Sequence, residues 1–297
     1  MRRYRDMLFG PRMAPYVFLL PFLAIFVVFR LWPATSAGIM SFQDVQGTES
    51  RDWVGLANYE SALSNPRFAK ALGNTVFYTL GTLLILIPIP LILAALLDSG
   101  RVVKGTLFRV SLFLPALTSL VVVSVIFRIV LARNGLLNAA LESVGLQPRF
   151  WLEAADLAVP SMIIIAAWRW TGINIIYFSS GLVNVPKDLY EAAAIDGASA
   201  WRTFRSITLP MIEPTILFVV VLSIIGGFQV FVEPLLLWSG GNSPGNGGLT
   251  VALLIYKTAF TSFDFGQAAA IGVVLAAIIV VVSVVQFRFL GGGRSAG

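Results

Sequence analysis

The sequence predicts an all-α polytopic membrane protein with six transmembrane helices. Of its 297 residues, 57% are hydrophobic and only 12% are charged, whereas about a quarter of the residues of a typical soluble domain carry a charge. The mean hydropathy of +0.85 agrees with a chain built for lipid. Long stretches without a charged residue alternate with short polar segments, and roughly 20 apolar residues suffice to cross the hydrocarbon of a bilayer.

Six stretches are apolar and long enough to form spans. Four of them contain no charge and run from Lys70 to Asp98, Arg109 to Arg128, Glu213 to Glu233 and Asp264 to Arg288. The first span begins near Pro15 and continues past Arg30, and the fourth, SMIIIAAWRWTGINIIYFSSGL, contains Arg169. The predicted spans, within a single transmembrane domain at 1–297, are 15–37, 74–97, 110–130, 160–182, 214–237 and 266–287.

The distribution of basic residues predicts the orientation, because Lys and Arg are enriched in cytoplasmic segments. With both termini inside, twelve basic residues lie in the cytoplasmic segments and six in the outer ones. The net charge of +6 needs no nucleic acid as a partner, because no basic run carries interleaved aromatic residues. The segment at residues 183–213 is therefore expected in the cytoplasm.

The composition excludes the commonest catalytic machinery. The chain has no cysteine and no histidine, so it has neither a Cys or His metal site nor a Ser-His or Cys-His nucleophile. The stretch GRVVKGT at 100–106 has the glycine spacing of a phosphate-binding loop, but Thr106 stands where the lysine should follow Gly105. We expect no catalytic residue, no metal site and no bound cofactor, and any ATP dependence must come from a partner.

The cytoplasmic segment contains the most unusual stretch of the chain, YEAAAIDGASAWRTFRSITLPMIEP at 190–214. Pro186 suits a helix start, and Asp188 and Glu191 in the early turns suit the positive end of the helix dipole. Gly197 is expected to end this helix, and Ser199 can cap a second one. The segment therefore predicts two short helices joined by a glycine bend.

This stretch resembles the cytoplasmic signature of permease subunits in binding-protein-dependent ABC importers. The matching pattern is Glu191-Ala192-Ala193, a glycine four residues later, and Ile207-x-Leu209-Pro210. The wider stretch GLVNVPKDLYEAAAIDGASAWRTFRSITLP resembles the carbohydrate branch, and the likeness extends through LWPATSAGIMSF, NGLLNAAL and FDFGQAAAIGVV. The end of the fifth span is similar to the first permease of a heterodimeric pair, although Glu233-Pro234 and WSGGNSPGNGG depart from the usual form.

The resemblance implies a type I permease fold, a non-catalytic subunit in a bacterial or archaeal cell (inner) membrane, and three protein partners. These are a second permease, a dimer of ATPase subunits that binds ATP and Mg, and an extracytoplasmic solute-binding protein, with membrane lipid around the spans. It also implies that the cytoplasmic segment couples this chain to the ATPase. The residues that would do so are Glu191, Ala192, Ala193, Asp196, Gly197, Leu209 and Pro210.

Polar residues inside the spans are candidates for a solute path, because a buried charge or amide is costly in lipid unless it faces protein or water. The fourth span contributes Arg169, Trp170 and Asn174, and the fifth contributes Gln229 and Glu233. Aromatic stacking and hydrogen bonds suit a sugar. A structural reading is equally open, with Arg169 and Glu233 as an ion pair and Asn174 and Gln229 as bridges between helices.

Two functions compete at this point. The first is half of the translocation pathway of an ATP-driven importer, for a sugar or oligosaccharide or for another solute. The second is an ion-coupled secondary transporter, which usually needs intramembrane acids and often an inverted repeat. Glu233 is the only acid suited to that role.

The stretch SGGNSPGNGG at 239–248 is expected to be a flexible loop.

Overall fold

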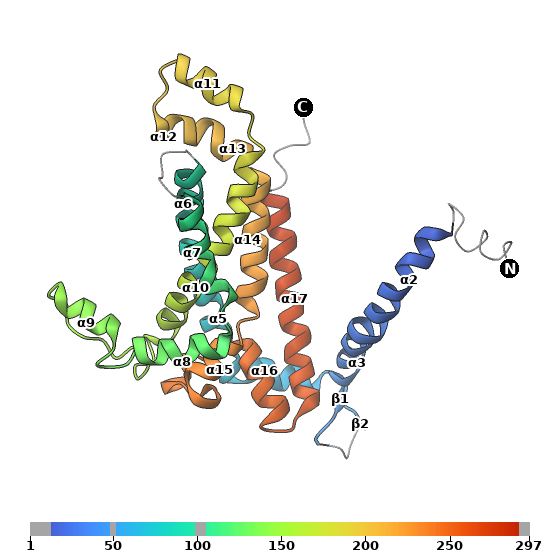
Figure 1. Cartoon of the computed structure of the whole chain (residues 1–297). Helices are drawn as coiled ribbons and strands as arrows, with labels where there is room; N and C mark the ends of the chain where they lie inside the picture. The colour runs from blue at the N-terminus through green and yellow to red at the C-terminus, as the bar shows by residue number, and fades with distance from the viewer. Residues whose placement is uncertain (1–12, 48–51, 99–104, 291–297) are drawn as a thin grey trace, which may run out of the picture. The chain divides into compact units, whose positions relative to one another are not determined.

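The computed structural model describes residues 13–47, 52–98 and 105–290, which are mostly helical (Figure 1). Within these ranges the strands are β1 (Gln43–Asp44) and β2 (Asp52–Trp53), which pair antiparallel. The predicted all-α class is therefore confirmed. The contacts divide the chain into two compact units, one made of the chain up to Ser64 with Ile255–Val274, the other of Asn65–Leu254 with the chain from Leu275 onward.

The smaller unit begins with one long apolar helix. It consists of α2 (Ala14–Phe26), the π-helical turn η1 (Val27–Leu31) and α3 (Trp32–Met40). The strands follow, and then α4 (Ala57–Ser64). Asn58 ties α4 to the chain after α3, because its Nδ2 donates to the carbonyl of Ser41 at 3.0 Å and to that of Gln43 at 2.8 Å.

The larger unit holds most of the helices and the candidate site. Its long helices are α5 (Pro66–Leu86), α10 (Ala158–Val183) and α14 (Glu213–Phe228). Helix α10 packs against α5, α14 and two shorter apolar helices, α6 (Pro88–Asp98) and α7 (Gly105–Leu117). The remaining elements of the fold are α8 (Leu120–Val130), α9 (Leu136–Ser143), α11 (Lys187–Ile195), α12 (Ala200–Thr203), η2 (Phe204–Thr208), α13 (Leu209–Met211), α15 (Val232–Leu237), η3 (Ser239–Gly241), η4 (Pro244–Asn246), α16 (Val251–Phe260) and α17 (Phe265–Leu290).

Several apolar helices are broken within the stretch that the sequence predicts as one span. Helices α7 and α8 meet at 100°, where Ser119 is extended (φ −56°, ψ 136°). The predicted fifth span, 214–237, is helical only to Phe228 and resumes as α15 after Phe231. Pro234 contributes to the second of these breaks, since a proline removes one backbone donor and clashes with the preceding turn.

Four described helices are long and apolar enough to cross a bilayer, and the number rises to six if each bent pair forms one span. The four are Ala14–Met40, Pro66–Asp98, Ala158–Val183 and Phe265–Arg288. The bent pairs are Gly105–Leu117 with Leu120–Val130, and Ala200–Met211 with Glu213–Phe228. The bounds of the six spans and the single domain remain predictions. The stretch 100–106 lies mostly outside the described residues.

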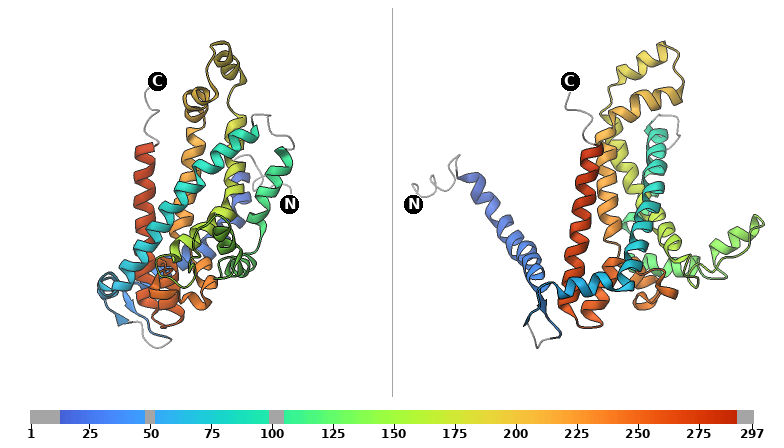
Figure 2. Two further views of the ribbon diagram at one scale, coloured as in Figure 1. Left: turned by 90° about the vertical axis from the view of Figure 1, so that its left-hand side faces the viewer. Right: turned by 180° about the vertical axis from the view of Figure 1, so that it is seen from behind.

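The short helices α11 and α12 lie beyond one end of α10 and α14. Both views in Figure 2 show them at the end opposite α15. The chain turns by 70° between the α12–α13 segment and α14. A break at Ile212 (φ −98°, ψ 9°) accounts for this turn. The larger unit therefore has a cavity region toward the α15 end and a projecting pair of helices at the other.

Candidate functional site

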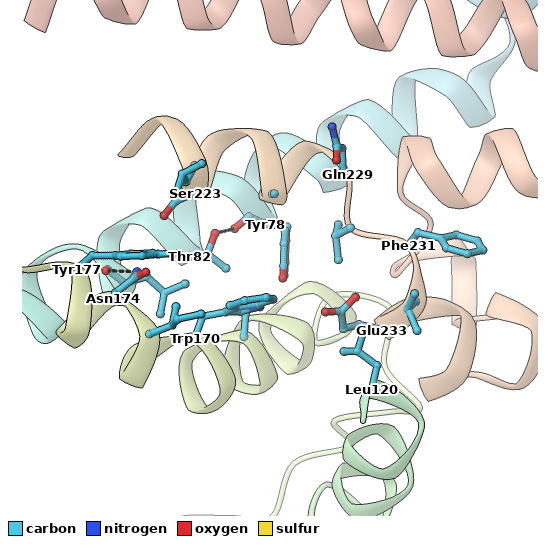
Figure 3. Close-up of a pocket in the computed structure, with 18 residues that line it drawn as sticks. Tyr78, Thr82, Leu120, Trp170, Asn174, Tyr177, Ser223, Gln229, Phe231 and Glu233 are labelled. Carbon is cyan, nitrogen blue, oxygen red and sulfur yellow. Dashed lines mark hydrogen bonds between the residues drawn. The ribbon is translucent and has the colours of Figure 1, made fainter. Parts of the chain in front are cut away.

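A cavity of about 410 Å³ lies among α5, α8, α10, α14 and α15 (Figure 3). Figure 3 shows Tyr78 of α5, Trp170 of α10 and Glu233 of α15 around the same space. Tyr177 and Phe231 add two more aromatic side chains to its wall. Further polar side chains on the lining are Thr82, Asn174, Ser223 and Gln229. The cavity combines flat aromatic surfaces with groups that can donate and groups that can accept hydrogen bonds.

The break after α14 brings Gln229 and Glu233 to this cavity. Helix α14 ends in Gly226-Gly227-Phe228, and a Cβ on Gly227 would lie 2.6 Å from the hydroxyl oxygen of Thr79. The glycine therefore allows α14 to approach α5 closely. The chain then leaves the helix at Gln229 and re-enters one at Val232, so Glu233 stands on a separate short helix instead of the end of a continuous span.

The carbonyl of Val230, inside this break, is held by a residue far along the chain. Thr250 donates its hydroxyl to the Val230 carbonyl at 2.7 Å, and the same hydroxyl oxygen accepts from the backbone N–H of Leu253 at 3.3 Å. Both Val230 and Thr250 are buried. The position of the cavity wall at Gln229 and Glu233 is therefore tied to the first turn of α16.

Arg169 does not line the cavity. Its Nη1 donates to the carbonyl of Thr118 at 2.8 Å, at the bend between α7 and α8, and its guanidinium carbon lies 5.3 Å from the centre of the Trp170 ring. In the part of the chain that the structure describes, no nitrogen of Arg169 comes within 4.0 Å of a carboxylate oxygen of Glu233. The ion pair considered from the sequence is not formed.

The structure thus brings four of the five proposed path residues into one cavity, namely Trp170, Asn174, Gln229 and Glu233. Their roles in transport remain predictions. The sequence reading missed Tyr78 and Thr82 on α5. A recognisable signal was present, because Thr75, Thr79 and Thr82 recur at helical spacing beside Tyr78 and all are buried. A polar stripe in an apolar helix indicates a face turned toward protein.

The proposed coupling element has the predicted helix, bend and helix. Helix α11 ends at Ile195 and Gly197 has φ +67°. The N–H of Ala198 bonds to the carbonyl of Ala193 at 2.9 Å and that of Gly197 to the carbonyl of Ala194 at 3.1 Å, the paired bonds of a Schellman turn. Ser199 caps α12 by accepting from the N–H of Arg202 at 3.3 Å. The hydroxyls of Tyr190 and Thr208, 3.1 Å apart, link the two halves.

The proposed coupling residues divide into exposed and packed groups. Glu191, Ala192, Asp196, Gly197 and Pro210 are exposed. Ala193 is buried, and Leu209 packs against an apolar cluster that includes Phe178 and Ile212. Of the three consecutive alanines, Ala192 and Ala194 are exposed and only Ala193 is turned into the protein.

Two exposed apolar residues of the same element were not predicted. Ile195 is 87% exposed and Trp201 is 66% exposed, one on each side of the bend. Trp201 stacks on Phe204 with ring centres 5.8 Å apart. Exposed hydrophobic side chains on both sides of the bend are compatible with a protein interface at this element.

The stretch at 239–248 is held in place, contrary to the flexible loop that its composition predicts. Asn74 donates to the carbonyls of Asn246 and Leu249, both at 2.9 Å. The N–H of Gly248 donates to the Ser243 hydroxyl at 2.8 Å. Its glycines serve close packing, since a Cβ on Gly247 would lie 2.1 Å from the carbonyl oxygen of Ala155.

Broken apolar helices around a cavity with polar and aromatic walls define a membrane transport subunit, and the comparisons identify its family. Residues 86–290 match the family described as "Binding-protein-dependent transport system inner membrane component". The arabinooligosaccharides transport system permease protein AraP of Bacillus subtilis (strain 168) is 44% identical over 99% of this chain and 94% of that protein. The lactose transport system permease protein LacF of Rhizobium radiobacter is 34% identical over 92% of each.

A solved structure shows the same fold. A bacterial ABC transporter involved in the import of the acidic polysaccharide alginate contains a chain with a TM-score of 0.82 and 23% identity, over 99% of this chain and 100% of that chain. The chain thus belongs to the family of inner membrane components of binding-protein-dependent transport systems. It is a multi-pass, non-catalytic permease subunit that depends on a solute-binding protein. The ion-coupled alternative is not favoured by this assignment.

Proposed function

We propose that this chain forms half of the translocation pathway of an ATP-driven importer for a sugar or oligosaccharide. The observation that supports this most strongly is the cavity, whose aromatic rings and amide, hydroxyl and carboxylate groups suit the flat faces and hydroxyls of a sugar. The extensive identity to permeases named for arabinooligosaccharide and lactose transport supports the same solute class.

The wider assembly is part of the same proposal. A second permease, as in a heterodimeric pair in which this chain is the first-permease type, completes the pathway. A dimer of ATPase subunits binds ATP and Mg and docks on residues 183–213, through Glu191, Asp196 and Gly197 and the exposed side chains of Ile195 and Trp201. Both termini lie in the cytoplasm, as the twelve basic residues of the inner segments favour.

Transport by the complete complex tests this proposal. The chain is reconstituted with its permease, ATPase and binding protein, and uptake of labelled sugars is followed with and without ATP inside the vesicles. We expect uptake that stops without ATP and continues when an ionophore collapses ion gradients. Uptake that survives ATP depletion and stops with the ionophore would contradict it.

The cavity is tested separately with side-chain replacements that keep volume. Gln229→Leu and Glu233→Gln should each raise the KM for uptake by about three- to tenfold, since one hydrogen bond to a neutral group contributes about 0.5–1.5 kcal/mol. Leu222→Ile, also on the lining but apolar, is the matched control. Unchanged uptake of every sugar by both variants would remove the cavity from the path.

A further inference from the structure

Asn174 is buried in α10 with its side chain at the cavity wall. Its Nδ2 donates to the backbone carbonyl of Leu86 at 2.8 Å, a residue 88 positions earlier in the chain (Figure 3). Leu86 is the last residue of α5 and also lines the cavity. The amide nitrogen of Asn174 is thus already bonded to the backbone at the cavity wall.

The Leu86 carbonyl needs this donor because of Pro90. In a continuous helix the carbonyl of residue 86 accepts from the N–H of residue 90, and proline has none. The helix breaks here, with Ile87 at φ −97° and ψ −62° between α5 and α6. Leu86 and Asn174 are both buried, and a buried carbonyl without a partner is costly, so a side chain supplies the missing bond.

The break held by this bond lies beside a wall of the cavity. Thr82 and Tyr78 stand on α5, about one and two turns before the break, and both line the cavity with Leu86. On the other side of the break, α6 packs along α10. A change in the angle between α5 and α6 therefore moves the aromatic wall relative to Trp170 and Tyr177.

A second polar residue of α10 acts on another break in the same manner. Arg169 donates to the Thr118 carbonyl at the 100° bend between α7 and α8. Helix α10 thus supplies one donor to each of two neighbouring broken helices. Both side chains hydrogen-bond to backbone carbonyls, and through these bonds they position helices around the cavity.

We propose that Asn174 is a positioning residue of the solute path: it sets the cavity's shape by holding the proline break between α5 and α6 through the Leu86 carbonyl. It is not the donor that recognises the solute. The inference rests on the proposed function in taking the cavity as the solute path, and its test includes a readout that does not depend on any solute.

A double-mutant cycle in the complete reconstituted transporter tests the bond itself. Asn174→Leu removes the donor at similar volume, and Pro90→Ala restores a backbone N–H for Leu86. We expect Asn174→Leu to raise the KM for sugar about tenfold with Pro90 present, and less than about threefold in the Pro90→Ala background, since the stranded carbonyl then has a partner. An equal rise in both backgrounds would show a solute ligand and overturn the proposal.

The matched control is Asn184→Leu. Asn184 lies at the end of the same helix, is exposed, and bonds within that helix to the carbonyl of Ser180 at 2.9 Å. It bridges no break, so its replacement should leave the KM within about twofold of the wild type. A comparable rise in this variant would assign the effect to α10 in general and would also overturn the proposal.

Spin-label distances give the second readout. The chain has no cysteine, so labels can be placed at Phe77 on α5 and Ile92 on α6, both exposed. We expect Asn174→Leu to shift or broaden the distance distribution, Asn184→Leu to leave it unchanged, and Pro90→Ala to suppress the effect of Asn174→Leu. An unchanged distribution in Asn174→Leu would overturn the proposal even if no sugar were transported, and so separates its failure from that of the proposed function.

Discussion

Substitution of Gly197 gives the most direct test of the proposed coupling to the ATPase. The Gly197 φ of +67° lies in the left-handed region, and a Cβ built there would meet no atom of this chain within 4 Å. A side chain at this position therefore costs backbone energy alone within the subunit. The two bonds of the Schellman turn, from Gly197 to Ala194 and from Ala198 to Ala193, depend on that conformation.

The size of the effect follows from this geometry. An L residue other than glycine pays roughly 1–2 kcal/mol in the left-handed region, and asparagine adopts it most readily. A β-branched residue is the least tolerated there. One to two kcal/mol corresponds to a factor of about 5–30 in an equilibrium. We therefore expect ATPase binding to weaken in the order Gly197→Asn, Gly197→Ala, Gly197→Val, with a loss of at least about tenfold for valine.

The assay is copurification of the ATPase from membranes, together with ATP-driven uptake. Asparagine and valine have similar volumes, so their comparison separates backbone conformation from bulk. If Gly197→Asn lost the ATPase as completely as Gly197→Val, the defect would come from a clash with the partner and the backbone argument would fail. If Gly197→Val bound and transported like the wild type, the bend would have no part in coupling.

Two further predictions concern the orientation and the docking surface. Cysteine at the exposed Ser199 should resist a membrane-impermeant thiol reagent in intact cells and cysteine at the exposed Ser239 should react, whereas the opposite labelling would reverse the topology. Glu191→Lys should release the ATPase by charge repulsion, while Glu191→Ala should cost at most about 1 kcal/mol because an exposed ion pair contributes little. Copurification of the ATPase measures the effect of both Glu191 variants, and a stronger loss of ATPase with alanine than with lysine would exclude a basic partner group.

Much of the fold could be predicted from the sequence because its signals are local. Charge-free length alone indicates where helices cross lipid, and the structure has apolar helices at all of these places. The coupling element was also predictable, since Gly197 and Ser199 act on neighbouring backbone through turn and cap bonds. These features depend on residues a few positions apart, which a single sequence displays directly.

The cavity could be predicted only in part because its geometry comes from distant contacts. The apolar run at 110–130 gave no sign of a 100° bend, which is held by Arg169 some fifty residues away. The glycine-rich stretch at 239–248 has the composition of a flexible loop, yet Asn74 fixes it from another helix. Composition indicates the conformation that a segment favours in isolation, whereas these two segments are fixed by hydrogen bonds from distant residues of the same chain.

The contacts at the breaks share one physical cause. Every proline or glycine that interrupts an apolar helix frees backbone groups, and these must find partners because lipid offers none. Asn174, Arg169 and Thr250 each supply a side-chain donor, from a distant part of the chain, to a carbonyl at a helix break. A polar residue inside a span can therefore either bind the solute or hold a helix break, and its hydrogen bonds show which of the two it does.

Thr250 tests this reasoning at the wall that carries Glu233. Thr250→Val keeps the shape but strands the buried carbonyl of Val230, at about 1–3 kcal/mol, and removes the cap on Leu253, at about 1 kcal/mol. Thr250→Ser keeps both bonds and loses only a methyl group. We expect a clear fall in the thermal stability of the purified complex and a raised KM for valine, and near-normal values for serine. Serine as damaging as valine would mean that packing of the methyl group, and not the hydroxyl, fixes the wall, since both replacements occupy the same fully buried site.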